Sequence, residues 1–300
     1  MKIFSGSSNP DLARKIAKQL GCQLGQIELS QFSNGECRVW IKEKVLNSKA
    51  IIVQSLSYPP DTHLMELCLI ADALKRQGVK KITAVIPWLG YCIQDKVFRP
   101  GEPLSSKVIA RILQTAKLER IITLDSHNQV IEGFFDIPFT ELFATDTLID
   151  YFKTQKLNID TIVSPDVGAL KKANRFSETF DLPLVVINKK RDRKTGQVSI
   201  ASVSDQVAGK KVLIVDDFIS TGGTLIQTAK FLKEKGVKKI YACLTHHFYI
   251  PGVQEKIEKS QLDCLYVTDT VQAPEKKYQK LKVVSIAKLI SDTIRKYEKI

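Results

Sequence analysis

The chain alternates between short runs of consecutive apolar residues and longer segments in which apolar residues recur every three or four positions. The short runs predict strands buried on both faces, and the longer segments predict amphipathic helices. This alternation is typical of α/β proteins, in which parallel strands are joined by right-handed helical crossovers. The predicted strands cover residues 2–5, 26–29, 37–41, 50–54, 81–86, 120–124, 161–164, 184–188, 211–215 and 240–245.

Helix boundaries are marked by capping and breaking residues. Asn9 is a predicted N-cap with Pro10 at the first helical position, and Gly21 marks the end of that helix. Further helices are predicted at 62–77, in a segment that ends near Lys117, and from Leu225 to the stop signal at Gly236.

One short sequence occurs twice. Gly78-Val-Lys-Lys-Ile82 recurs as Gly236-Val-Lys-Lys-Ile240, each time between a predicted helix and a predicted strand. The preceding strands end in Gln54-Ser55 and in Asp216-Asp217. The repeat predicts one βαβ unit used in two similarly folded halves, each a mainly parallel sheet flanked by helices. The acidic pair is in the second copy, so we expect the first half to contribute something else.

The composition is that of an ordinary globular protein. With 300 residues, 44% of them hydrophobic, the chain has room for one large domain or two of about 150 residues. It contains no apolar run near the roughly 20 residues of a membrane span. The N-terminus enters a strand-like segment without the pattern of a signal peptide, so we expect a cytoplasmic protein and no membrane partner. The six cysteines lack zinc-site spacing, and most of them lie in apolar runs and are expected to be buried thiols.

The net charge of +13 would permit nucleic-acid binding. However, the lysines are spread over predicted helix faces, and no nucleic-acid motif appears. We therefore expect a solvated basic surface with a basic cleft for polyphosphates, and no nucleic-acid partner.

The richest stretch chemically is 212–224. Asp216 and Asp217 follow a predicted buried strand, at the sheet edge where open α/β sheets bind ligands. Ser220-Thr-Gly-Gly-Thr224 then leads into a helix, and such a loop can cradle an anion with backbone N–H groups and hydroxyls. It does not match the nucleotide P-loop pattern. Since carboxylates suit sugar hydroxyls or magnesium, the stretch predicts a phosphorylated-sugar site; a capped strand-turn-helix without a ligand is the alternative.

This stretch resembles the 5-phosphoribosyl-diphosphate (PRPP) loop of the type I phosphoribosyltransferase fold, which serves both the transferases and PRPP synthetase. Other segments, in order along the chain, resemble the ribose-phosphate diphosphokinase (PRPP synthetase) family. They are Phe32-Ser-Asn-Gly-Glu36, His63-Leu-Met-Glu-Leu67, Gly90-Tyr-Cys-Ile-Gln-Asp95, Leu124-Asp-Ser-His127, Gly133-Phe-Phe-Asp-Ile-Pro138, Val163-Ser-Pro-Asp166 and Lys189-Lys-Arg191.

The resemblance implies two phosphoribosyltransferase-like domains and a diphosphoryl transfer. The domains would be 1–144, with the ATP side and oligomer contacts, and 145–284, with the ribose 5-phosphate loop and a catalytic lid at 189–197. A C-terminal helix in 285–300 would pack back on the first domain. The implied reaction moves the diphosphoryl group of Mg-ATP to the 1-hydroxyl of ribose 5-phosphate and yields PRPP and AMP.

The resemblance also assigns site residues. Lys189, Arg191 and His127 would be catalytic, and His127 and Asp166 would contact Mg²⁺. Ribose 5-phosphate would be bound by Arg191, Asp216, Asp217, Ser220, Thr221, Gly222, Gly223 and Thr224. Without the resemblance, a lone histidine is more often structural, and the charge run that begins at Lys189 reads as a solvated basic hairpin.

ATP would be bound by Phe32, Asn34, Gly35, Glu36, Gln94, Asp95 and His127. In this family the 32–36 loop reaches the ATP of a neighbouring subunit, which implies a dimer-based homo-oligomer, of which a hexamer is one form, with ATP sites shared between subunits. On its own, Asn34-Gly35 equally predicts a simple β-turn.

Three departures from the family pattern affect the functional prediction. Ile93 stands where the family usually has an ATP-contacting arginine, Ser220 replaces its commonest aspartate, and 96–103 differs from the branch controlled by ADP and phosphate. We expect weaker ATP binding or an altered nucleotide preference, and no allosteric control of that kind. A non-catalytic regulatory relative and, with less support, a phosphoribosyltransferase remain the alternatives, and a nucleic-acid-binding protein comes last.

Overall fold

The computed structural model describes residues 1–155, 157–191, 198–203 and 206–298, with side chains described outside 188–205. The described chain forms two compact units. Unit 1 contains Met1–Ala144, Thr270–Gln272 and Ser285–Ile300, and unit 2 contains Thr145–Asp269 and Ala273–Val284. The break after Ala144 is where the first domain was expected to end, but 145–284 is not continuous, since Thr270–Gln272 lies in unit 1. There, the Thr270 carbonyl accepts a 2.8 Å hydrogen bond from Ser55 Oγ.

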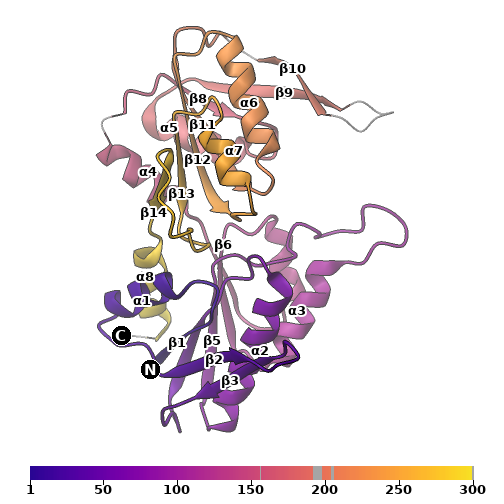
Figure 1. Ribbon diagram of the computed structural model, residues 1–300, viewed down its shortest axis with the longest axis vertical. Helices are drawn as coiled ribbons and strands as arrows, with labels where there is room; N and C mark the ends of the chain where they lie inside the picture. The colour runs from indigo at the N-terminus through magenta and orange to yellow at the C-terminus, as the bar shows by residue number, and fades with distance from the viewer. Residues whose placement is uncertain (156, 192–197, 204–205, 299–300) are drawn as a thin grey trace. The chain divides into compact units, whose positions relative to one another are not determined.

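Unit 1 is built on a five-stranded parallel sheet with the order β1-β4-β5-β6-β7 and a separate antiparallel pair, β2-β3 (Figure 1). Its strands are β1 (Lys2–Ser5), β2 (Ile27–Gln31), β3 (Cys37–Ile41), β4 (Lys49–Val53), β5 (Lys81–Ile86), β6 (Arg120–Leu124) and β7 (Phe139–Leu142). Its helices are α1 (Pro10–Gln19), α2 (Pro60–Arg76), α3 (Ser105–Thr115), the 3-10 helix η1 (Gln129–Phe134) and α8 (Ala287–Glu298).

The first and last helices of unit 1 lie side by side. The predicted N-cap of α1 is confirmed, because Asn9 Oδ1 accepts a 3.1 Å hydrogen bond from Leu12 N and Pro10 opens the helix. Ile16 of α1 is buried, and its carbonyl lies 3.5 Å from Ser291 Oγ of α8. Helix α8 therefore completes the covering of α1, although it follows unit 2 in the sequence (Figure 1).

Unit 2 contains a seven-stranded sheet with the order β10-β9-β8-β11-β12-β13-β14. All neighbours are parallel except β9 and β10. Its strands are β8 (Thr161–Ser164), β9 (Leu184–Arg191), β10 (Val198–Val203), β11 (Lys211–Ile219), β12 (Lys239–His247), β13 (Cys264–Thr268) and β14 (Leu281–Val284). Its helices are α4 (Thr145–Thr154), α5 (Leu170–Phe180), α6 (Gly223–Glu234) and α7 (Val253–Glu258). The core of this unit includes buried aliphatic residues of β11 and β12 packed with residues of α6 and α7.

The short repeat has the same backbone structure in both units. Gly78 and Gly236, the first residues of the two copies, have φ angles of +83° and +80°, which a residue with a side chain adopts only under strain. The hydrogen bonds that follow each helix also match: Val79 N–Leu74 O and Val237 N–Leu232 O, both 3.1 Å, and Lys80 N–Ser48 O and Lys238 N–Lys210 O, both 2.8 Å. The same type of βαβ connection therefore occurs in each of the two sheets.

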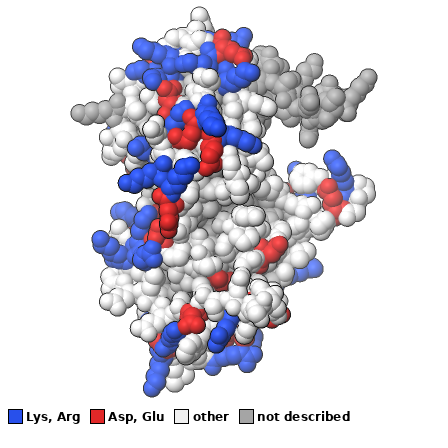
Figure 2. Space-filling model, viewed as in Figure 1, with Lys and Arg blue, Asp and Glu red and all other residues white. Residues whose placement is uncertain are grey.

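Basic and acidic side chains are interspersed on the face drawn in Figure 2. Several surface lysines pair with carboxylates, for example Lys239 with Asp263 at 2.6 Å. Among the described helices, none has both the length and the apolar character needed to cross a membrane.

Candidate functional site

The strand order of unit 2 predicts a ligand site between the carboxyl ends of β8 and β11. From β8 the chain moves outward to β9, and it then returns to add β11 on the other side of β8. At such a switch point, the loops that follow the two strands leave in opposite directions and open a crevice at the carboxyl edge. Asp166 follows β8, and Asp216 and Asp217 lie in β11, so sequence and topology indicate the same place.

The acidic pair is not beyond the strand, as the sequence predicted, but inside it. β11 pairs with β8 only as far as Ile214–Val163, whereas it pairs with β12 to Ile219–His247. The expected end at residue 215 was therefore wrong, because the partner on one side stops while the other continues. The carboxylates lie in the part of β11 that extends past its pairing with β8.

The loop 220–224 connects this extended strand to α6. Gly222 has φ +76°, and a Cβ atom there would lie 3.2 Å from Val253 Cγ1, so both conformation and space favour glycine. Ile226 N donates to Gly222 O at 3.0 Å, so Gly222 begins the helical bonding and the N–H groups of the first turn of α6 face away from the helix body. Thr221 and Thr224 are exposed beside them. This geometry can bind a phosphate.

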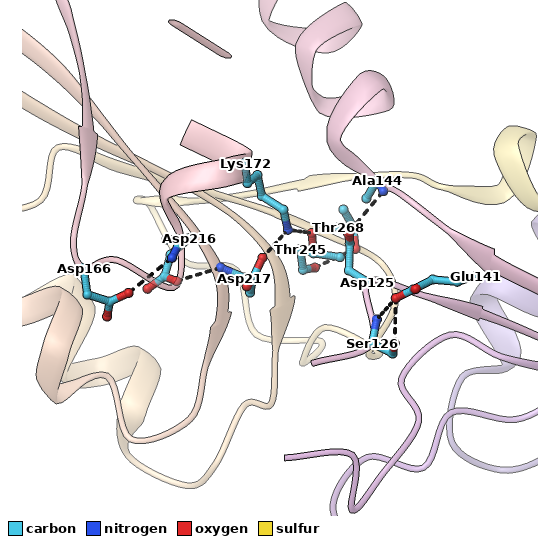
Figure 3. A network of polar contacts seen from close by, with 11 residues as sticks. Asp125, Ser126, Glu141, Ala144, Asp166, Lys172, Asp216, Asp217, Thr245 and Thr268 are labelled. Atoms are coloured by element: carbon cyan, nitrogen blue, oxygen red, sulfur yellow. Dashed lines mark hydrogen bonds and ion pairs between the residues drawn. The ribbon is translucent and has the colours of Figure 1, made fainter. Parts of the chain in front are cut away.

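Three carboxylates crowd the neighbouring surface (Figure 3). Asp216 Oδ1 accepts a 2.8 Å hydrogen bond from Asp217 N, and Asp217 Oδ1 lies 2.7 Å from the ammonium group of Lys172. The pKa of Asp216 is raised to about 7, chiefly by burial and also by the negative charges of Asp166 and Asp217, while the Asp217 N–H and Lys172 oppose the shift. A bound cation or sugar hydroxyls would stabilise the ionised form.

The raised pKa of Asp216 predicts how the stability of the ligand-free protein depends on pH. Between the ordinary value of 3.8 and about 7, the folded protein holds a proton on Asp216 that the unfolded chain has lost. Its contribution to the free energy of unfolding therefore falls as the pH rises through this range. Urea unfolding at pH 5 and pH 8 should show Asp216→Asn gaining stability relative to wild type at the higher pH. The prediction would be contradicted if the difference in free energy of unfolding between Asp216→Asn and wild type were the same at pH 5 and at pH 8.

Asp166 shapes the turn between β8 and α5. Its Oδ1 accepts a 3.2 Å hydrogen bond from Ala169 N, and its carbonyl accepts one of 2.7 Å from Ser164 Oγ. A Cβ atom at Gly168 would lie 3.2 Å from the same Oδ1, so glycine leaves room for the carboxylate.

Among the described residues, no three His, Cys, Asp or Glu side chains are placed to hold a metal ion together, and the two predicted metal residues lie in different units. Mg²⁺ commonly takes one or two protein carboxylates and completes its shell with water and substrate phosphates. The carboxylates around Asp216 fit that behaviour, because their mutual repulsion would be relieved by a dication.

In unit 1 a strained turn presents His127. Asp125, which follows β6, has φ +38°, and its Oδ2 accepts a 3.1 Å hydrogen bond from Ala144 N. Glu141 of β7 accepts two bonds from Ser126, from N at 2.7 Å and from Oγ at 2.6 Å (Figure 3). Burial raises the pKa of the Glu141 carboxyl, which the two Ser126 donors oppose. His127, which follows Ser126 in the chain, is exposed.

The turn at His127 is joined to the predicted ATP segment at 94–95. Asn128 Nδ2 donates to Asp95 Oδ2 at 2.7 Å, and Gln94 Oε1 accepts from Ser105 Oγ at the start of α3. The structure therefore brings Asp95 and the His127 turn together. Sequence reasoning missed Glu141, because nothing in its local sequence shows that β7 pairs beside β6.

Residues 32–36 form the tight turn between β2 and β3. Phe32 N donates to Glu36 O at 2.9 Å, Gly35 N donates to Phe32 O at 2.8 Å, and Gly35 has φ +87°. The Gly35 N–Phe32 O bond closes a β-turn over residues 32–35, so Asn34 is a central residue of the turn and Gly35 is its last. The ring of Phe32 is 52% exposed, which leaves it accessible for contact with another molecule, while its predicted role in ATP binding stays a prediction.

The unit 1 counterpart of the acidic pair has a structural role. Gln54 is fully buried, and its amide accepts from Ser8 N at 3.1 Å and Ser8 Oγ at 2.7 Å and donates to Glu66 Oε1 at 2.6 Å. A Cβ atom at Gly6 would overlap this amide. These bonds fix the loop between β1 and α1, so this copy of the βαβ unit does not present its polar pair to a ligand.

The predicted lid lies at the limit of the described structure. Lys189 and Arg191 belong to the backbone of β9, but their side chains and residues 192–197 are outside the described residues.

Comparisons with known proteins give one consistent result. Residues 1–116 match the N-terminal domain of ribose phosphate pyrophosphokinase, and residues 137–276 match the phosphoribosyl transferase domain. Ribose-phosphate pyrophosphokinases of Fusobacterium nucleatum and Bacillus subtilis are 39% and 38% identical, each over 98% of this chain and 94% and 93% of their own lengths. The crystal structure of phosphoribosylpyrophosphate synthetase from Mycobacterium smegmatis superposes with a TM-score of 0.91 at 33% identity, covering 99% of this chain and 98% of that one.

Proposed function

This chain belongs to the ribose-phosphate pyrophosphokinase family, and we propose that the extended end of β11 in unit 2 binds the ribose 5-phosphate on which it acts. The enzyme transfers the diphosphoryl group of ATP to the 1-hydroxyl of ribose 5-phosphate and releases PRPP and AMP. The observation that carries the site proposal is the position of Asp216 and Asp217 beside an anion-binding loop at the switch point of the sheet.

Each end of the sugar phosphate has a complementary group in this site. The loop from Ser220 to Thr224 and the first turn of α6 bind the 5-phosphate through backbone N–H groups and hydroxyls. The carboxylate of Asp216, with Asp217 beside it, accepts hydrogen bonds from the ribose hydroxyls. Because both ends are held, the 1-hydroxyl has one orientation toward the incoming diphosphoryl group.

The diphosphoryl donor is bound by residues of unit 1. We assign ATP contacts to His127, Gln94 and Asp95, and assign contacts from Phe32, Asn34, Gly35 and Glu36 to a neighbouring subunit of a homo-oligomer. The hydrogen bond from Asn128 to Asp95 joins the His127 turn to the 94–95 segment, which supports assigning His127, Gln94 and Asp95 to one ATP-binding surface. The exposed ring of Phe32 supports the second assignment.

Positive charge is needed where the phosphate oxygens gain charge in the transition state. We assign this role to Lys189 and Arg191 of β9, and Arg191 also to contact with ribose 5-phosphate. β9 is the neighbour of β8 on the side away from β11, and its carboxyl end lies at the same edge of the sheet as Asp166. Mg²⁺, which His127 and Asp166 would help to hold, neutralises and orients the phosphate oxygens when bound.

Ile93 predicts a change in nucleotide affinity. Its side chain is 41% exposed, so an arginine there would keep its charge in water until a nucleotide binds. A charge-assisted hydrogen bond contributes about 1.5–3 kcal/mol, so Ile93→Arg should lower KM for ATP about tenfold or more. Val97→Arg, at a 53% exposed position of the same segment, is the matched control for added charge. Equal KM values for ATP in wild type and Ile93→Arg would count against the assignment.

Two alternatives use the same fold. A phosphoribosyltransferase needs the sugar-phosphate loop but not the segments assigned to ATP. A non-catalytic regulatory relative would be supported by Ile93 and opposed by the retained Asp166, Asp216, Lys189, Arg191 and His127. Phosphorus NMR of the product separates them, because the synthetase produces a new diphosphate on the sugar from ATP and ribose 5-phosphate. A transferase would instead consume PRPP in the presence of a base, and a regulatory relative would do neither.

A further inference from the structure

A buried lysine links three strand ends of the proposed ribose 5-phosphate site. Lys172 lies in α5, and only 8% of its side chain is exposed. Its Nζ lies 2.7 Å from Asp217 Oδ1 in β11 and 2.9 Å from Thr245 Oγ1 in β12 (Figure 3). Since α5 itself follows β8, one ammonium group connects the carboxyl ends of β8, β11 and β12.

The position of Lys172 is unfavourable for the helix that carries it. Lys172 is the third residue of α5, and the positive end of the helix dipole disfavours a cation in the first turn. Burial of the ammonium group adds a desolvation cost, which hydrogen bonds and a paired charge must offset. An exposed lysine side chain at this position would avoid the desolvation cost, so the contacts with Asp217 and Thr245 point to a role in the site.

The pairing also determines the orientation of Asp217. The side chain of Asp217 is 36% exposed, so without a partner it could turn into solvent or toward the ligand. With Lys172, one oxygen of Asp217 is engaged toward β12, while Asp216 Oδ1 accepts the Asp217 N–H. The Asp217 carboxylate is thus held by the Lys172 ammonium group, and the Asp216 carboxylate is held by the backbone N–H of Asp217.

Lys172 in addition balances the charge of the crevice. Asp166, Asp216 and Asp217 bring three negative charges when ionised, and Lys172 compensates one of them. The two remaining negative charges could be balanced by a dication or could accept hydrogen bonds from several hydroxyl groups. Removal of Lys172 would take away the cation that engages the Asp217 carboxylate beside Asp216.

We propose that Lys172 is a positioning residue for ribose 5-phosphate, which acts by holding the Asp217 carboxylate on the side of β12 so that the neighbouring Asp216 carboxylate keeps its orientation toward the sugar. This inference rests on the proposed function, because it assumes that the sugar hydroxyls lie at Asp216. Lys172 itself does not contact the reacting atoms.

The test measures binding of ribose 5-phosphate by isothermal titration calorimetry, which needs no turnover. Lys172→Met, which keeps the length of the side chain and removes its charge, should raise the Kd for ribose 5-phosphate about tenfold. Its KM for ATP should stay within a factor of two. Lys171→Met, at the exposed neighbouring position of α5, should leave the Kd unchanged. Lys172→Arg, which restores the charge, should recover part of the lost affinity.

A second variant covers the case in which Lys172→Met does not fold. Asp217→Asn removes the partner of the lysine, and it should raise the Kd by a similar factor. The double variant should be no weaker than the worse single variant, because residues that act as a pair are not additive. An unchanged Kd in Lys172→Met, or fully additive losses, would overturn the proposal. If wild type binds ribose 5-phosphate but forms no AMP, the proposed function fails while the Kd values still decide the role of Lys172.

Discussion

Asp216→Asn is expected to lower kcat/KM for ribose 5-phosphate about 100-fold or more, while it makes the ligand-free protein more stable above pH 7. A hydrogen bond to a charged group contributes about 1.5–3 kcal/mol, and loss of the charge weakens contacts with two ribose hydroxyls together. Stability changes in the opposite direction, because the neutral amide removes a charge that burial, and also repulsion from Asp166 and Asp217, makes unfavourable in the folded protein. Loss of activity with a gain in stability would identify Asp216 as a ligand-binding carboxylate.

The control for this prediction is an exposed carboxylate of the same unit. Asp150 of α4 is 74% exposed and pairs with Lys153 at 3.4 Å. Asp150→Asn should change neither kcat/KM nor the free energy of unfolding by a measurable amount. Steady-state kinetics with ribose 5-phosphate varied at saturating ATP, together with urea unfolding, provides both readouts. If Asp216→Asn lost stability along with activity, its role would be structural.

Lys189→Ala should cause the largest loss in turnover. A cation that contacts the phosphate oxygens only as charge develops stabilises the transition state more than the bound substrates. Removal of such a group commonly costs a factor of 100 to about 1,000 in kcat. We therefore expect kcat to fall by about 1,000-fold, with KM for ATP and for ribose 5-phosphate within a few-fold of wild type.

Lys190→Ala is the matched control, since it removes the same charge one position further along β9. It should retain activity close to that of wild type. A loss of equal size in both variants would indicate a general effect of positive charge in this segment. A change in KM for ATP alone would assign Lys189 to nucleotide binding and not to the transition state.

The sequence predicted most of the unit that carries the sugar site, because local signals agree there. The buried strand from 211, the glycine pair and the stop at Gly236 all belong to one βαβ unit, and the structure confirms its order and type. The end of β11 was wrong by four residues, since it depends on where β8 and β12 stop. β7, β10, β13 and β14 were not predicted, and three of these, β7, β10 and β14, are edge strands of their sheets.

The supporting residues of the site could not be found from local sequence. Lys172 is 73 positions from Thr245, and Glu141 is 15 positions from Ser126, so neither pair follows a local spacing rule. Lys172 reads as one more lysine on an amphipathic helix until β12 is placed beside β11. Strand order, which is set by the packing of the whole sheet, brings such partners together.

The most direct test of the account is the formation of AMP by the purified protein with Mg-ATP, with and without ribose 5-phosphate. Diphosphoryl transfer to the sugar requires AMP to appear only when ribose 5-phosphate is present, in an amount equal to the PRPP formed. Asp216→Asn in the same assay should need far more ribose 5-phosphate for the same rate. If no AMP formed at ATP concentrations well above those that saturate typical enzymes, or if AMP formed equally without the sugar, the assigned activity would be wrong.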